Sequence, residues 1–223
     1  MMLLRAVEDN LPIIIYHTDE GLKETLDKKN CQCDGVIFKK ITKNKYDKRE
    51  NNRNSSLWRL KALLESPFEN TVYMDNDIFI VHPGFKEGFR IAEHYGLAMA
   101  QNPRMFIKTY EGTVGDVEIG EDISDHDNME ISEMPKYMTA LNMGIIFYNK
   151  KSEKFIKSVL SEQETHPSRG QASLARAIWK TKYSPYTLPL NWLVCRAHEG
   201  ITMPITLHAG HENILEWWKR EFI

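Results

Sequence analysis

Short apolar runs alternate with amphipathic stretches along most of the chain, a pattern typical of a sheet flanked by helices. The apolar runs are continuous rather than alternating, which favours strands that are covered on both faces. Strands are predicted at 11–16, 35–38, 71–74, 97–100, 143–148 and 205–208. Helices are predicted at 20–29, 55–65, 84–94, 150–163, 170–181 and 212–221, the second of them N-capped by Ser55 or Ser56. The pattern therefore predicts an α/β protein with a mixed, mostly parallel sheet.

Amino-acid composition excludes several classes of binding partner and of protein. The 223 residues carry 29 Lys and Arg against 31 Asp and Glu, a formal net charge of −2, which argues against binding to nucleic acid or to an anionic membrane surface. No apolar span approaches the roughly 20 residues of a transmembrane helix. Three cysteines are too few for a disulfide framework. We therefore expect a soluble protein of a reducing compartment.

Two carboxylates, Asp75 and Asp77, directly follow the apolar strand predicted at 71–74, and another apolar run begins at Ile78. Carboxylates in such a place repel each other and lose hydration unless a cation lies between them. Mg²⁺ and Mn²⁺ prefer oxygen ligands of this kind and complete their coordination with substrate phosphate. Asp and Asn also favour ordinary turns, so the motif alone leaves a turn and a metal site both open.

The surrounding sequence resembles the nucleotide-sugar-binding region of GT-A glycosyltransferases, in particular the glycogenin and lipooligosaccharide galactosyltransferase group. Residues 56–68 resemble the basic helix that precedes the family's DxD strand. The other matching segments are Leu141–Asn149 (the N-x-G strand), Gly170–Leu174 (the D-Q-x-x-L helix start), Leu188–Trp192 (the L-P segment) and Leu207–His211 (the late strand with a metal-binding His). The resemblance covers roughly residues 11–215, and it implies a single Rossmann-like GT-A domain over 1–223.

This resemblance implies a metal-dependent glycosyltransferase that moves a hexose from a nucleotide-sugar, most simply a UDP-sugar, to a hydroxyl of a glycan or glycoconjugate. Mn²⁺ or Mg²⁺ would stabilise the departing diphosphate as a Lewis acid. The implied metal ligands are Asp75, Asp77 and His208, with His211 as an alternative to His208. The residues implied at the reactive carbon are Asn142 and Gln171. The implied donor-binding residues are Tyr16, Thr18, Arg59, Lys61, Asp75 and Asn76, although Arg59 and Lys61 lie two positions apart on a helix and cannot both face the donor.

Two departures from the family pattern leave the chemistry open. Gly170 stands where the family has the acid of its D-Q pair. An inverting reaction would need a base from elsewhere, for example from the acidic segment 111–133, whereas a retaining reaction would need only Gln171 and the acceptor. The family's first strand, which cradles the uracil, has no counterpart before 11–16.

Two other classes of protein stay open, the first because of these departures and the second because it shares the α/β architecture. One is a catalytically inactive module that binds a nucleotide-sugar or a carbohydrate. The other is a sugar-nucleotide nucleotidyltransferase, although the Gly-rich basic loop that such an enzyme needs is not seen near the N-terminus. Golgi members of the family carry an N-terminal membrane anchor, and the sequence shows no apolar segment of that kind. We therefore expect a cytoplasmic protein of bacterial or viral origin.

Overall fold

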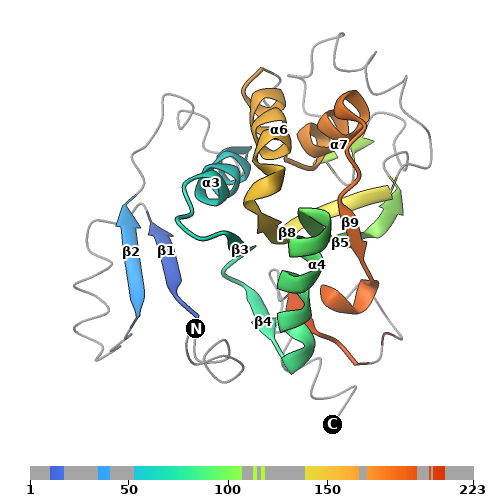
Figure 1. Ribbon diagram of the computed structural model, residues 1–223. Coiled ribbons are helices and arrows are strands. Elements are labelled where there is room, and N and C mark those ends of the chain that lie inside the picture. Colours follow the sequence, from blue (N-terminus) through green and yellow to red (C-terminus); the bar gives the residue numbers. More distant parts are fainter. Residues whose placement is uncertain are drawn as a thin grey trace.

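The computed structural model describes residues 11–17, 35–40, 53–106, 113–114, 117–118, 139–165, 170–194, 201 and 203–208 (Figure 1). The strands are β1 (Ile13–His17), β2 (Val36–Lys40), β3 (Asn70–Met74), β4 (Ile78–Ile80), β5 (Leu97–Phe106), β6 (Thr113–Val114), β7 (Val117–Glu118), β8 (Thr139–Asn149), β9 (Tyr186–Leu188) and β10 (Thr206–His208). The α-helices are α3 (Arg53–Leu64), α4 (Glu87–Tyr95), α6 (Glu153–Thr165) and α7 (Gly170–Thr181). Short 3₁₀ turns are η2 (Pro83–Lys86), η3 (Lys150–Ser152) and η4 (Leu190–Trp192).

The central sheet has the order β3-β8-β5-β9. Strand β8 runs antiparallel to both β3 and β5, and β9 runs parallel to β5. Strands β3, β5 and β9 therefore point in one direction, and β8 alone opposes them. In smaller two-stranded sheets, β1 pairs with β2 in parallel, and β4 pairs with β10 in the antiparallel direction. The predicted α/β class, with a mixed and mostly parallel sheet flanked by helices, is confirmed.

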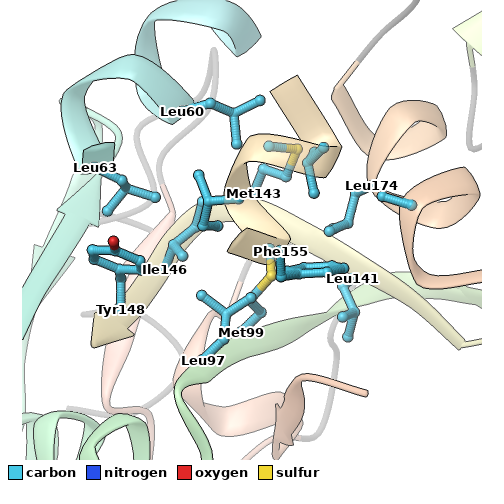
Figure 2. Close-up of a cluster of buried hydrophobic side chains, with 13 residues drawn as sticks. Leu60, Leu63, Leu97, Met99, Leu141, Met143, Ile146, Tyr148, Phe155 and Leu174 are labelled. Atoms are coloured by element: carbon cyan, nitrogen blue, oxygen red, sulfur yellow. The ribbon is translucent and has the colours of Figure 1, made fainter. Parts of the chain in front are cut away.

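Helices cover both faces of this sheet (Figure 1). On one face, apolar residues of α3, α6 and α7 pack against β5 and β8, and Figure 2 shows Leu60, Leu63, Phe155 and Leu174 directed at the strands. On the other face, α4, η2 and η4 pack against the same strands together with β4 and β9. Burial on both faces explains why the strands are continuous apolar runs in the sequence.

The predicted helices match the structure at differing precision. The helix at 170–181 is α7, with the same bounds. The helices at 55–65, 84–94 and 150–163 correspond to α3, to η2 with α4, and to η3 with α6. The N-cap prediction was wrong, because α3 begins at Arg53 and places Ser55 and Ser56 inside its first turn. The helices predicted at 20–29 and 212–221 lie outside the described residues. Within the described part of the chain, no helix is long and apolar enough to cross a bilayer.

Strand β8 is irregular at the point where it passes the end of β3. Its side chains at Leu141 and Met143 pack into the same cluster as Ile146, which strict alternation would not allow. The pairing with β5 shifts in the same place, since Met99 lies opposite Ile146 but Gln101 lies opposite Leu141. Such irregularities re-aim side chains and are common beside functional sites. This one contains Asn142 and Gly144.

Candidate functional site

The two carboxylates of the DxD motif lie on the turn that links β3 to β4. The backbone N–H of Asp75 donates to the carbonyl of Gly144 at 2.8 Å, which extends the β3–β8 ladder by one residue. The N–H of Ile78 then donates to the carbonyl of Asp75 at 3.2 Å and closes the turn. Asp77 immediately precedes β4. Because strands hold both ends of the turn, the backbone positions of Asp75 and Asp77 are fixed.

Strand β10 brings His208 to this turn from more than a hundred residues away in the sequence. It pairs with β4 so that His208 lies opposite Ile78, next to Asp77. The His208 Nε2 atom is 3.3 Å from Asp77 Oδ1. One ligand atom each from Asp75, Asp77 and His208 lies within 4.8 Å of the other two. The predicted metal-binding residues are therefore brought together.

This donor set suits a hard divalent cation. Bonds of about 2.1 Å place the ligand atoms around Mg²⁺ roughly 3–4.2 Å apart, so small rotations of these side chains would meet that requirement. The Asp75, Asp77 and His208 side chains are 22%, 33% and 24% exposed. These side chains are thus partly exposed, and an ion held by them would have room for further oxygen ligands.

Asp75 also has two partners inside the protein. The Tyr73 hydroxyl donates to Asp75 Oδ1 at 2.7 Å, and Arg59 Nη2 lies 3.5 Å from the same oxygen. The Arg59 guanidinium lies over the Tyr73 ring, 5.6 Å from its centroid. Burial raises the pKa of Tyr73 above its ordinary value, with Arg59 opposing and Asp75 reinforcing the shift. The phenol therefore keeps its proton and stays a donor to Asp75.

The helix geometry separates Arg59 and Lys61, two basic residues of α3. Arg59 turns toward Asp75, whereas Lys61 places its ammonium over the Trp58 ring, 5.4 Å from the centroid. Asn76 is exposed at the tip of the turn. Thr18 and His211 lie outside the described residues, so the structure does not test them.

Two of the predicted donor-binding residues carry buried polar atoms without a partner. Among the described residues, these atoms are Arg59 Nε and Tyr16 Oη. Lys39 lies over the Tyr16 ring, and burial together with the negative charge of Glu65 raises the pKa of Tyr16. A buried donor without a partner is costly. Neither atom has a partner among the described residues that offsets this cost.

Asn142 and Gly144 lie beside Asp75 on β8. The N–H of Gly144 donates to Asn142 Oδ1 at 2.6 Å, so the Asn142 amide has its NH₂ group left to offer. A Cβ atom at Gly144 would lie 2.9 Å from Asn142 Oδ1 and 3.2 Å from Asp75 Oδ2. Only a glycine lets these two side chains approach the strand so closely. Gln171 lies in the first turn of α7, which contacts β8 and α3, and its predicted role stays a prediction.

Sequence reasoning missed two residues of this site. Tyr73 was part of the strand motif but was given no role, although its position two residues before Asp75 on a strand puts both side chains on one face. Gly144 was recognised only as part of a pattern. Its function depends on the β3–β8 register, which local sequence does not reveal.

No protein-family model and no curated protein sequence matches the chain. Solved structures do match. The galactosyltransferase LgtC, solved with donor and acceptor sugar analogues, aligns with a TM-score of 0.60 and 13% identity over 93% of this chain and 80% of its own. Mouse xyloside xylosyltransferase 1 gives 0.55 and 9% over 87% and 82%. The bifunctional glycosyltransferase WbbM gives 0.59 and 16% over 94% of this chain and 42% of its own.

The chain has a GT-A fold. The fold implied by the sequence resemblance is thereby confirmed, while identities of this size carry nothing finer than the fold. Within that fold, the Asp75–Asp77–His208 cluster lies at the end of β3. The ends of strands in α/β sheets are where such folds bind their ligands. That the whole chain from 1 to 223 forms one domain stays a prediction.

Proposed function

We propose that the chain is a metal-dependent glycosyltransferase that takes a hexose from a nucleotide-sugar, most simply a UDP-sugar, and passes it to a hydroxyl of a glycan or glycoconjugate. The observation that carries the proposal is the convergence of Asp75, Asp77 and His208 within 4.8 Å, in a fold shared with glycosyltransferases. The β4–β10 pairing thus adds an imidazole to the two carboxylates of the turn, which supports a metal site more strongly than the turn alone.

The side chains of the site would bind different parts of the metal–donor complex, according to their chemistry. Asp75, Asp77 and His208 would hold Mn²⁺ or Mg²⁺, whose Lewis acidity stabilises the diphosphate as it departs. Arg59 would bring positive charge to the donor, because its guanidinium lies beside the metal-binding cluster, 3.5 Å from Asp75 Oδ1. Asn142 offers its NH₂ group to a sugar hydroxyl, because its oxygen already accepts from Gly144. Fixed donors of this kind stabilise developing charge without having to reorganise during the reaction.

The nucleoside end of the donor would lie toward β1. Tyr16 has a buried hydroxyl without a partner, and Lys39 supplies positive charge beside it. Tyr16 and Thr18 are our proposed residues for the base and ribose. Of Arg59 and Lys61 on α3, Arg59 is our choice for the donor and Lys61 is not, because the Lys61 ammonium lies over Trp58.

The test is a calorimetric titration of UDP into the full chain, with and without Mn²⁺. We expect UDP to bind in the presence of Mn²⁺ and binding to weaken at least 10-fold in Asp77→Ala, since an ion that loses one of three protein ligands is held much less firmly. Glu87→Ala is the matched control, because it removes an exposed carboxylate on α4 whose ion-pair partner is Arg90 and which is not part of the Asp75–Asp77–His208 cluster. No UDP binding, or equal binding by Asp77→Ala, would contradict the proposal.

Turnover separates the proposal from its alternatives. Incubation with a panel of UDP-sugars and glycan acceptors should release UDP or yield a glycosylated product. A protein that binds UDP with Mn²⁺ but neither transfers nor hydrolyses any sugar would be an inactive binding module. A protein that forms UDP-sugar from UTP and a sugar phosphate would be a nucleotidyltransferase.

A further inference from the structure

The two oxygens of the Asp75 carboxylate have different surroundings. Oδ1 accepts the Tyr73 hydroxyl proton at 2.7 Å and lies 3.5 Å from Arg59 Nη2. The Tyr73 hydroxyl therefore uses one of the two lone-pair sites of Oδ1, and the Arg59 guanidinium lies beside the same oxygen as its charge partner. Oδ2 faces Gly144, whose missing Cβ leaves space around it. Of the two oxygens, Oδ2 has its lone pairs left for a cation.

Tyr73 is itself held in place on several sides. Its backbone pairs with Ile146 in the β3–β8 ladder, and its ring packs at the edge of the buried cluster shown in Figure 2. The Arg59 guanidinium lies over the ring. A hydroxyl on so fixed a ring is a rigid reference point, whereas a free Asp side chain rotates broadly about its terminal torsion.

We propose that Tyr73 is a positioning residue: its hydroxyl fixes the Asp75 carboxylate so that Oδ2 alone is presented to the divalent cation. This role rests on the proposed function, since it requires that Asp75 binds a metal ion. Asp77 has a different neighbour, the imidazole of His208. The two carboxylates of the motif are therefore oriented by different neighbours. Tyr73 and Arg59 contact Asp75, whereas His208, itself a proposed metal ligand, contacts Asp77.

A simpler interpretation is that the hydrogen bond merely satisfies a half-buried phenol. Removal of the hydroxyl has a different effect under each interpretation. Loss of a purely structural bond would change the free energy of unfolding and leave metal affinity alone. Loss of a positioning bond changes metal affinity, and it does so only while Asp75 is present to be positioned.

The experiment measures Mn²⁺ binding to the full chain by the electron paramagnetic resonance signal of the free ion. Tyr73→Phe removes the hydroxyl and keeps the ring, and we expect Mn²⁺ to bind about 10-fold more weakly, the usual lower limit for groups that orient a metal ligand. Tyr148→Phe is the matched control, because it removes a hydroxyl from a buried tyrosine on the neighbouring strand β8. It should leave Mn²⁺ affinity unchanged.

A double-mutant cycle with Asp75→Ala decides between the two interpretations. In the Asp75→Ala chain, where Asp77 and His208 remain, adding Tyr73→Phe should cost no further affinity. Equal Mn²⁺ affinity in wild type and Tyr73→Phe, or the same loss with and without Asp75, would overturn the positioning role while leaving the proposed function standing. Absence of Mn²⁺ binding in the wild type would instead overturn both.

Discussion

At the scale of single residues, the clearest prediction concerns the substitution Gly144→Ala. A Cβ there would lie 2.9 Å from Asn142 Oδ1 and 3.2 Å from Asp75 Oδ2, so Gly144→Ala must displace two side chains of the site. The Asn142 amide is the end of a flexible side chain and moves cheaply, so we expect the free energy of unfolding to fall by only about 1 kcal/mol. We expect sugar transfer or UDP-sugar hydrolysis to fall about 10-fold or more, because misplaced groups lose their fixed orientation.

A second glycine provides the control for that variant. A Cβ at Gly84 would lie 2.9 Å from His82 Nδ1 and 3.4 Å from Ile205 Cδ1, a similar degree of crowding in η2. Gly84→Ala should cost similar stability in a urea titration but leave turnover near that of the wild type. If the two variants lose activity equally, close approach at Gly144 has no special bearing on the site.

The residues of the site differed in how visible they were in the sequence. Asp75 and Asp77 stand together after an apolar strand, so a local pattern was enough to find them. His208 was identified through resemblance to a family, and the reason for its position is the β4–β10 pairing. The hydrogen bond from Tyr73 to Asp75 is compatible with strand geometry but needed the structure to be seen, because the same spacing would also suit a tyrosine that points away from the carboxylate.

At the scale of elements, α6 and α7 are joined by an ion pair whose arginine is buried and whose carboxylate is partly exposed. Arg176 on α7 is almost fully buried, and its Nε lies 3.3 Å from Glu162 Oε2 on α6. Arg176 also donates to Ser173, which in turn donates to Gln163. Removing one member of a buried pair costs about 3–5 kcal/mol, and the lower end applies here because Glu162 is partly exposed and keeps Lys180 as a partner. We expect Arg176→Met to reduce the free energy of unfolding by about 3 kcal/mol, as measured by urea denaturation.

Lys180 supplies the comparison for this pair. It contacts the same carboxylate, at 3.0 Å from Glu162 Oε1, but its side chain is 41% exposed. An exposed pair contributes about 0–1 kcal/mol, so Lys180→Met should change stability by less than about 1 kcal/mol. Equal losses in Arg176→Met and Lys180→Met would mean that burial adds nothing to the pairing of these helices.

Elements were predictable where one local signal dominated. The apolar stripe of α7 sets its length, and the predicted bounds are those of the structure. Strand β9 was missed because Tyr186–Leu188 is three residues long and lies between two prolines, which hide its pattern. The irregularity of β8 was also not predicted. An unbroken apolar run looks the same whether or not an extra residue interrupts its alternation, and the interruption is visible only in the pairing with β5.

At the scale of the whole molecule, the proposed site draws on distant parts of the chain. Tyr16 comes from β1, Arg59 from α3, Asp75 from the turn after β3, Asn142 from β8 and His208 from β10. The order of such segments along the chain could be compared with a family pattern, and the GT-A fold was predicted in that way. Their meeting in space depends on strand order and register, which no segment encodes alone.

This arrangement predicts that donor and metal stabilise the molecule as one unit. A ligand that contacts segments from β1 to β10 binds only when all of them are in place, so unfolding should remain a single transition that moves to higher temperature. With Mn²⁺ already bound, UDP at about 100 times its Kd should add about 2.7 kcal/mol, which raises Tm by about 5–10 °C for a chain of this size. Chelation of the metal with EDTA should reverse most of the shift. In thermal denaturation Glu87→Ala should keep the shift and Asp77→Ala should lose it, whereas a full shift in Asp77→Ala would mean that UDP binds somewhere other than the turn between β3 and β4.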